Sequence, residues 1–173
     1  MTTAPTYRLV EALTAAQFDA ARALMEEYAA HIGASLGVDL GFQGFAAELK
    51  QLPDMYGPPS GCLLLASRDD EWVGCCALRR FSGDVGEMKR LYTQPKVRGA
   101  NLGRRLTELL MAKARALGYQ RMVLDTLEGM AAAQALYRSL GFRETGPYYF
   151  NPMPGVTYME LDLGTPEFTA LRS

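Results

Sequence analysis

The segment 98–105 combines the residue types that bind a phosphate group. It reads Arg-Gly-Ala-Asn-Leu-Gly-Arg-Arg and lies between a predicted strand that ends near Thr93 and a predicted helix that begins near Asn101. A glycine-bearing turn that leads into a helix presents unpaired backbone N–H groups at the positive end of the helix dipole, where pyrophosphate binds. Gly99 and Gly103 leave room for such a ligand because they carry no side chain. Taken alone, the segment fits an ordinary loop with a solvated basic face equally well.

Two familiar phosphate motifs are excluded by their spacing. No Gly-Lys-Ser/Thr follows the turn, so it is not a P-loop. The glycine spacing also differs from the dinucleotide-binding fingerprint, and the preceding strands are predicted to be antiparallel. The 18 basic and 19 acidic residues give a net charge of −1, which disfavours a nucleic-acid partner. Binding of a nucleotide or nucleic acid through the basic residues of segment 96–105 is the third functional hypothesis, after the two given at the end of this subsection.

The periodicity of apolar residues predicts one α/β domain over residues 1–173. A capping box at Thr14 opens a helix that we expect to end at Gly33, and a second helix, 45–52, is expected to stop at Pro53. Further helices are predicted at 101–117 and 132–140. Strands are predicted at 7–10, 62–67, 72–78, 85–93, 122–126 and 157–163, with another starting at Phe142. The sheet is predicted to be mixed and mostly antiparallel, with one strand–helix–strand unit near residue 100, and the tail 164–173 carries no clear signal.

Composition places the chain among globular proteins, with 49% hydrophobic and 21% charged residues. Cys62, Cys75 and Cys76 cannot all pair and have no zinc-binding spacing, so we expect neither a disulfide framework nor a metal site. We expect Cys75 and Cys76 to point to opposite faces of the sheet and to serve packing. No apolar stretch approaches 18 residues and the first residues do not resemble a signal peptide, so the expected location is the cytoplasm, without a membrane partner.

Five motifs, in order and spacing, closely resemble the GCN5-related N-acetyltransferase (GNAT) family over about residues 60–163. They are Glu87-Met-Lys-Arg-Leu-Tyr-Thr93, Pro95, Arg98-Gly-x-x-Leu-Gly103, Leu124-Asp-Thr126 and Ala133-x-x-Leu-Tyr137-x-x-x-Gly-Phe142. The resemblance implies that family's fold, in which two central strands splay apart, and acetyl-CoA as the co-substrate. Asn101 stands where the family pattern has its first glycine. Because Asn tolerates left-handed backbone angles and caps helices well, we expect the pyrophosphate site to be retained.

The resemblance also assigns residues to the coenzyme. It implies that the backbone of the strand end pairs with the pantetheine arm, and that the turn into the helix binds the pyrophosphate through its N–H groups. The strand-end residues are Leu91, Tyr92 and Thr93, and the turn residues are Val97, Arg98, Gly99, Ala100, Asn101, Leu102, Gly103 and Arg104. Met130 stands where many members have Asn, which removes one polar contact.

Tyr137 and Glu87 are the predicted catalytic residues. By the motif match, Tyr137 is the general acid that protonates the departing thiolate, although its spacing with Leu136 and Leu140 also fits a core aromatic. Glu87 is the predicted base, with a structural ion pair to Lys89 or another basic residue as an equal alternative. Strand alternation places Glu87, Lys89 and Leu91 on one face, and Met88, Arg90 and Tyr92 on the other. The resemblance implies the Leu91 N–H as the oxyanion donor.

The predicted function is transfer of an acetyl group from acetyl-CoA to a primary amine of a small molecule or peptide, directly within a ternary complex. A non-catalytic acyl-CoA-binding module of the same fold is the alternative. The acceptor is not predicted, and family members are often homodimers. Residues 148–151, 26–28, Asp125 and Glu128 are weaker candidates for the acceptor side, and His31 is expected to have no catalytic role.

Overall fold

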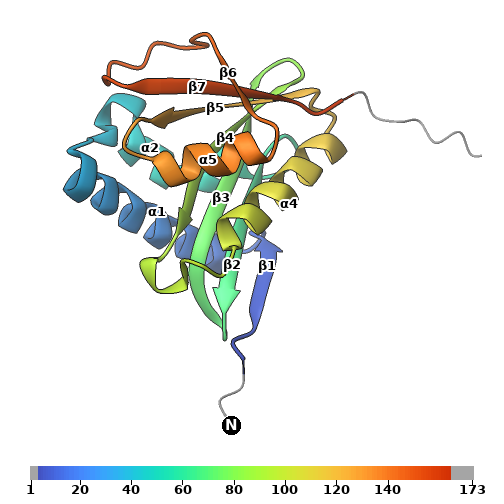
Figure 1. Cartoon of the computed structure of the whole chain (residues 1–173). Coiled ribbons are helices and arrows are strands. Elements are labelled where there is room, and N and C mark those ends of the chain that lie inside the picture. Colours follow the sequence, from blue (N-terminus) through green and yellow to red (C-terminus); the bar gives the residue numbers. More distant parts are fainter. Residues whose placement is uncertain (1–3, 165–173) are drawn as a thin grey trace, which may run out of the picture.

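A seven-stranded sheet forms the centre of the molecule, in the order β1-β2-β3-β4-β5-β7-β6 (Figure 1). The computed structural model describes residues 4–164, so most of the predicted tail 164–173 lies outside the described residues. The strands are β1 (Tyr7–Glu11), β2 (Cys62–Arg68), β3 (Glu71–Ser82), β4 (Val85–Thr93), β5 (Arg121–Leu127), β6 (Arg143–Thr145) and β7 (Val156–Asp162). All neighbours pair antiparallel except β4 and β5, which are parallel. The predicted mixed, mostly antiparallel α/β fold is confirmed.

Helices cover both faces of this sheet (Figure 1). They are α1 (Ala15–Leu36), α2 (Phe45–Lys50), α3 (Leu52–Tyr56), α4 (Leu102–Ala116) and α5 (Ala131–Ser139), with short 3-10 turns η1 (Leu40–Gln43) and η2 (Pro95–Val97). The apolar side of α4 packs on one face of the sheet together with Tyr137 of α5. The apolar sides of α1 and α3 pack on the opposite face. No helix of the described part of the chain is long and apolar enough to cross a membrane.

The parallel pair β4–β5 holds together at one end only. Residue pairing joins Val85 to Arg121, Gly86 to Met122 and Glu87 to Val123, and no further pairs follow. β5 instead stays paired along its whole length with β7. The carboxyl halves of β4 and β5 therefore separate, which confirms the predicted splay and opens the centre of the sheet.

A β-bulge in β4 overturns the predicted alternation of side chains. Tyr92 pairs with Cys75 and Lys89 pairs with Ala77, so two residues of β4, Arg90 and Leu91, stand opposite one residue of β3. Arg90 has a positive φ of 60°, which is uncommon for a bulky residue. The extra residue reverses the facing that follows it. Leu91 consequently packs with the α4 face and Tyr92 with the α1 face, whereas simple alternation would have put Tyr92 on the face of Met88.

Two predicted helix boundaries are wrong for identifiable reasons. Helix α1 continues through Gly33 and ends at Gly37, which takes the left-handed conformation (φ 67°) and donates its N–H to the Gly33 carbonyl. The predicted helix 45–52 is two helices, because Pro53 occupies the first turn of α3 rather than stopping α2. Proline is well tolerated there, since the first N–H groups of a helix have no partner within it.

Candidate active site

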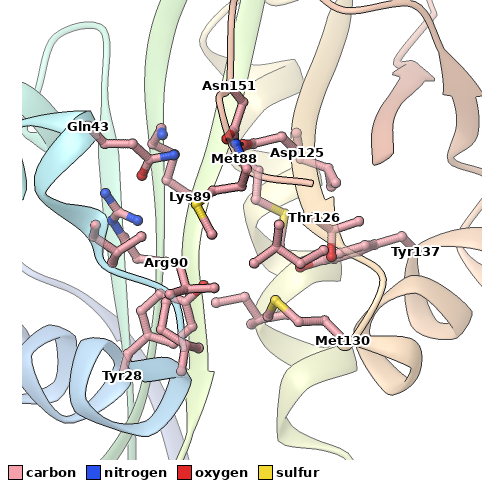
Figure 2. A pocket seen from close by; sticks show the side chains of 17 residues that line it. Tyr28, Gln43, Met88, Lys89, Arg90, Asp125, Thr126, Met130, Tyr137 and Asn151 are labelled. Atoms are coloured by element: carbon pink, nitrogen blue, oxygen red, sulfur yellow. Dashed lines mark hydrogen bonds between the residues drawn. The ribbon is translucent and has the colours of Figure 1, made fainter. Parts of the chain in front are cut away.

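The gap between β4 and β5 opens into two adjacent cavities that share part of their lining. The outer groove has a volume of about 470 Å³ and lies between α1, the end of β4 and the starts of α4 and α5. The inner pocket, of about 60 Å³, lies deeper between the two strands (Figure 2). Both are lined by Tyr28, Ile32, Leu91 and Met130, so a ligand in the outer groove can extend into the inner pocket.

Five of the residues predicted for the coenzyme line the outer groove: Leu91, Tyr92, Thr93, Arg98 and Gly103. The side chains of Val97 and Leu102 are buried in the core and anchor the turn, with Ala100 packed against the same core. Arg104 points elsewhere, because its guanidinium donates to Glu108 and Ser139. The structure thus brings the strand end and the turn together on one groove.

The turn before α4 has the backbone geometry of an anion site. Gly99 (φ 90°) and Asn101 (φ 61°) both take positive φ values, so Asn101 adopts the conformation for which glycine would otherwise be needed. No side chain caps α4, and the N–H groups of Leu102, Gly103 and Arg104 have no backbone acceptor among the described residues. Such free N–H groups at a helix start attract a negatively charged group.

Tyr137 projects from α5 into the inner pocket (Figure 2). Its ring packs against Phe142, with ring centroids 5.7 Å apart, and the side chain is buried in the core. The hydroxyl forms no hydrogen bond within residues 4–164. Burial raises the pKa of the phenol well above its ordinary value, because the charged phenolate would lose hydration. The hydroxyl therefore stays protonated and is a potential proton donor.

Glu87 lies outside the lining of both cavities, at the last residue pair that joins β4 to β5. It is 1% exposed. One carboxylate oxygen accepts from Nε of Arg79 at 2.8 Å, and the other accepts from the hydroxyl of Tyr148 at 2.7 Å. The ion-pair partner of Glu87 is thus Arg79, with Lys89 outside ion-pair distance.

Asp125 is the carboxylate that lines the inner pocket. Its Oδ2 accepts from the Tyr149 hydroxyl at 2.5 Å and from Nδ2 of Asn151 at 2.8 Å. The Tyr149 hydroxyl also accepts from Nε2 of Gln43 at 3.0 Å, which links η1 to the late loop. Two weak candidates from the sequence, Asp125 and the segment 148–151, therefore belong to one hydrogen-bonded cluster.

A buried ion pair holds the bulge of β4. Nη2 of Arg90 lies 2.7 Å from Oε2 of Glu48, and Nε of Arg90 lies 3.2 and 3.1 Å from the two carboxylate oxygens. Tyr56 donates its hydroxyl to Glu48 as well, and the Arg90 guanidinium lies 5.1 Å from the ring centre of Phe45. Helices α2 and α3 therefore fix the residue that directs Leu91 into both cavities. No pattern near Glu48 indicates this role from sequence.

Other residues that the sequence analysis considered, Glu27, His31 and Glu128, lie outside the inner pocket. Glu27 accepts hydrogen bonds from Tyr92 and Gln94 and so ties α1 to the end of β4. His31 lies in the outer groove, with Nε2 at 3.3 Å from the Arg98 guanidinium. Glu128 is exposed.

Cys75 and Cys76 lie on opposite faces of the sheet, as predicted. Burial raises the pKa of Cys75 to about 12, so its thiol is not a nucleophile at neutral pH.

A sheet split between two parallel strands, with a phosphate-type turn beside the split, is the arrangement that the resemblance to the N-acetyltransferases implied. Comparison with known proteins agrees. The model of the acetyltransferase (GNAT) family matches residues 40–142. An uncharacterized N-acetyltransferase of Schizosaccharomyces pombe is 43% identical over 143 residues, covering 81% of this chain and 85% of its own.

Solved structures show the same fold. An acetyltransferase from Streptococcus agalactiae superposes with a TM-score of 0.75 at 26% identity, over 90% of this chain and 98% of its own. A Salmonella typhimurium protein solved with its cofactor acetyl-CoA has a TM-score of 0.62 at 24% identity, over 91% of this chain and 94% of its own. The chain belongs to the GNAT family of acetyltransferases. Its relatives are named N-acetyltransferases, and the family match supports that enzymatic activity for this chain.

Proposed function

We propose that this N-acetyltransferase transfers an acetyl group from acetyl-CoA to a primary amine in the inner pocket, directly and without a covalent enzyme intermediate. One observation carries the proposal: the outer groove, which begins at the free N–H groups of α4, continues into the pocket that holds the Tyr137 hydroxyl. Acetyl-CoA bound to the Salmonella protein of the same fold supports this choice of coenzyme.

The coenzyme follows the two parts of the groove. The turn 97–104 binds the pyrophosphate through main-chain N–H groups. The pantetheine arm runs along Leu91, Tyr92 and Thr93 like an added strand, which brings the thioester to the junction of the two cavities. There the backbone N–H of Leu91 stabilises the oxyanion, and the bulge at Arg90 sets its direction.

The proton movements use two groups that line the inner pocket, Tyr137 of α5 and Asp125 of β5. The attacking amine must lose a proton, and the thiolate leaves more easily when it is protonated. Tyr137 gives its proton to the sulfur. For the amine, we assign proton removal to Asp125, which lines the inner pocket, directly or through a water molecule. Glu87, the base predicted from sequence, positions Arg79 and Tyr148 in this assignment.

Coenzyme binding is tested by filling the groove at Gly103. A Cβ on Gly103 would meet only Leu136, at 3.6 Å, so we expect Gly103→Val to keep the fold and to place its methyl groups in the outer groove. We expect the affinity for acetyl-CoA, measured by calorimetry, to fall at least about 10-fold, equivalent to about 1.4 kcal/mol. Gly146→Ala is the control, since a Cβ there meets nothing within 4 Å. Unchanged affinity of Gly103→Val would contradict this path for the coenzyme.

The base is tested by comparing Asp125→Asn with Glu87→Gln. We expect Asp125→Asn to lower kcat by about 10²-fold at neutral pH, the lower end of what general base catalysis supplies. The loss should shrink as pH rises, because more of the amine is then already neutral. Glu87→Gln should keep the shape of the wild-type pH profile. A pH-dependent loss of kcat in Glu87→Gln, together with a wild-type pH profile in Asp125→Asn, would assign the role of base to Glu87.

A further inference from the structure

Lys89 is a buried basic residue that has no role in the proposed transfer of the acetyl group. Its side chain comes from β4, is 9% exposed and lines the inner pocket. Within residues 4–164 it has no carboxylate at ion-pair distance, whereas the flanking Arg79 and Arg90 each have one. Its Nζ instead lies over the ring of Tyr149, 5.9 Å from the ring centre.

Neither nearby carboxylate forms an ion pair with Lys89 among residues 4–164, and each accepts hydrogen bonds from other groups. The carboxylate of Glu87 accepts hydrogen bonds from Arg79 and Tyr148. Oδ2 of Asp125 accepts hydrogen bonds from Tyr149 and Asn151. A buried ammonium without a counter-charge is unfavourable. Burial accordingly lowers the pKa of Lys89, while the charge of Glu87 opposes this shift in part. An anion that enters the pocket would restore the missing partner.

The same pocket offers further polar atoms without partners. Oγ1 of Thr126, a buried residue, and Oε1 of Gln43 have no hydrogen-bond partner among the described residues, and both residues line the pocket. Figure 2 shows Gln43 and Lys89 on the β4 side, facing Asp125 and Thr126 on the β5 side. Among the described residues, the pocket thus presents a cation without an ion pair on one wall and a carboxylate on the other, which suits a ligand with both charges.

We propose that the acceptor is an amine that also carries a carboxylate, in the manner of a free α-amino acid. Its carboxylate pairs with Lys89, and its amino group lies on the Asp125 side, toward the thioester and Tyr137. This inference rests on the proposed function and adds the substrate class to it. A neutral amine would leave Lys89 buried without its partner, and sites built around buried polar groups reject analogues that leave such groups unpaired.

The test compares acids with their matched amides. Release of CoA thiol is measured with the twenty proteinogenic L-amino acids and with their carboxamides, which keep the amine and lose the charge. We expect kcat/KM for the preferred acid to exceed that of its carboxamide by about 100-fold. Preference for the carboxamides would overturn the inference and leave the proposed function standing. Binding of acetyl-CoA without turnover of any of these amines, or of a panel of simple primary amines, would overturn both.

Variants then assign the preference to Lys89. Lys89→Met, similar in length but uncharged, should reduce the acid-to-amide ratio at least about 10-fold, mainly by raising KM for the acid. Lys89→Arg keeps the charge and should retain most of the preference. Lys50→Met, at an exposed lysine of α2, is the matched control. Calorimetry with acetyl-CoA checks that each variant is folded, and a folded Lys89→Met with the wild-type ratio would overturn the inference.

Discussion

Replacement of Tyr137 by Phe should lower kcat by about 10²- to 10⁴-fold, the range that a positioned general acid contributes. The substitution removes only the hydroxyl, which forms no hydrogen bond within the described part of the chain, and keeps the ring on Phe142. Acetyl-CoA affinity and thermal stability should therefore stay close to wild type. Steady-state assay of thiol release, together with calorimetry, separates the two effects.

The pH dependence gives a second check on Tyr137. Burial raises the pKa of this phenol well above its ordinary value, so the acid form persists through the range in which the amine becomes neutral. The wild-type rate should consequently rise with pH and show no loss near pH 10 from this group. Tyr119→Phe is the control, because Tyr119 is equally buried but donates to the Ser60 carbonyl, away from both cavities. Equal turnover in Tyr137→Phe and Tyr119→Phe would remove the acid role.

Replacement of Glu48 by Ala should lower the free energy of unfolding by about 3–5 kcal/mol, the usual effect of removing one member of a buried ion pair. The Arg90 and Glu48 side chains are only 5% and 4% exposed, so Arg90 would keep a buried charge without a partner. Arg90 also holds a positive φ at the bulge, a conformation that needs support from its surroundings. Urea unfolding followed by circular dichroism measures the change.

An exposed ion pair provides the matched control for Glu48. Glu144 pairs with Arg138 at 2.8 Å, but their side chains are 64% and 50% exposed. Glu144→Ala should change the free energy of unfolding by less than about 1 kcal/mol, because water screens such pairs. A loss of that small size for Glu48→Ala would show that the bulge does not depend on the ion pair.

Local sequence was sufficient for the elements that carry the coenzyme turn. The apolar spacing of 102–117 predicted α4. Asn101, which stands where the family pattern has a glycine, takes the left-handed conformation that Asn tolerates. These features depend on backbone preferences of neighbouring residues, which act over a few positions along the chain.

Local sequence was insufficient wherever neighbouring residues were compatible with two different local structures. Pro53 is compatible with stopping one helix or starting another, and the packing of Leu52 and Tyr56 on α1 favours the start. Regular alternation was the natural prediction for β4, yet the bulge is stabilised by an ion pair between Arg90 and Glu48, 42 residues apart.

The partners within the site were likewise decided by the tertiary structure. Tyr148 reaches Glu87 across 61 residues, and Tyr149 reaches Asp125 across 24. The sequence by itself determined that this protein has the turn, strands and helices of an acetyltransferase. Only the folded chain decided which buried charges are paired and left Lys89 without an ion pair among residues 4–164, because such pairing depends on distances that form when remote segments pack together.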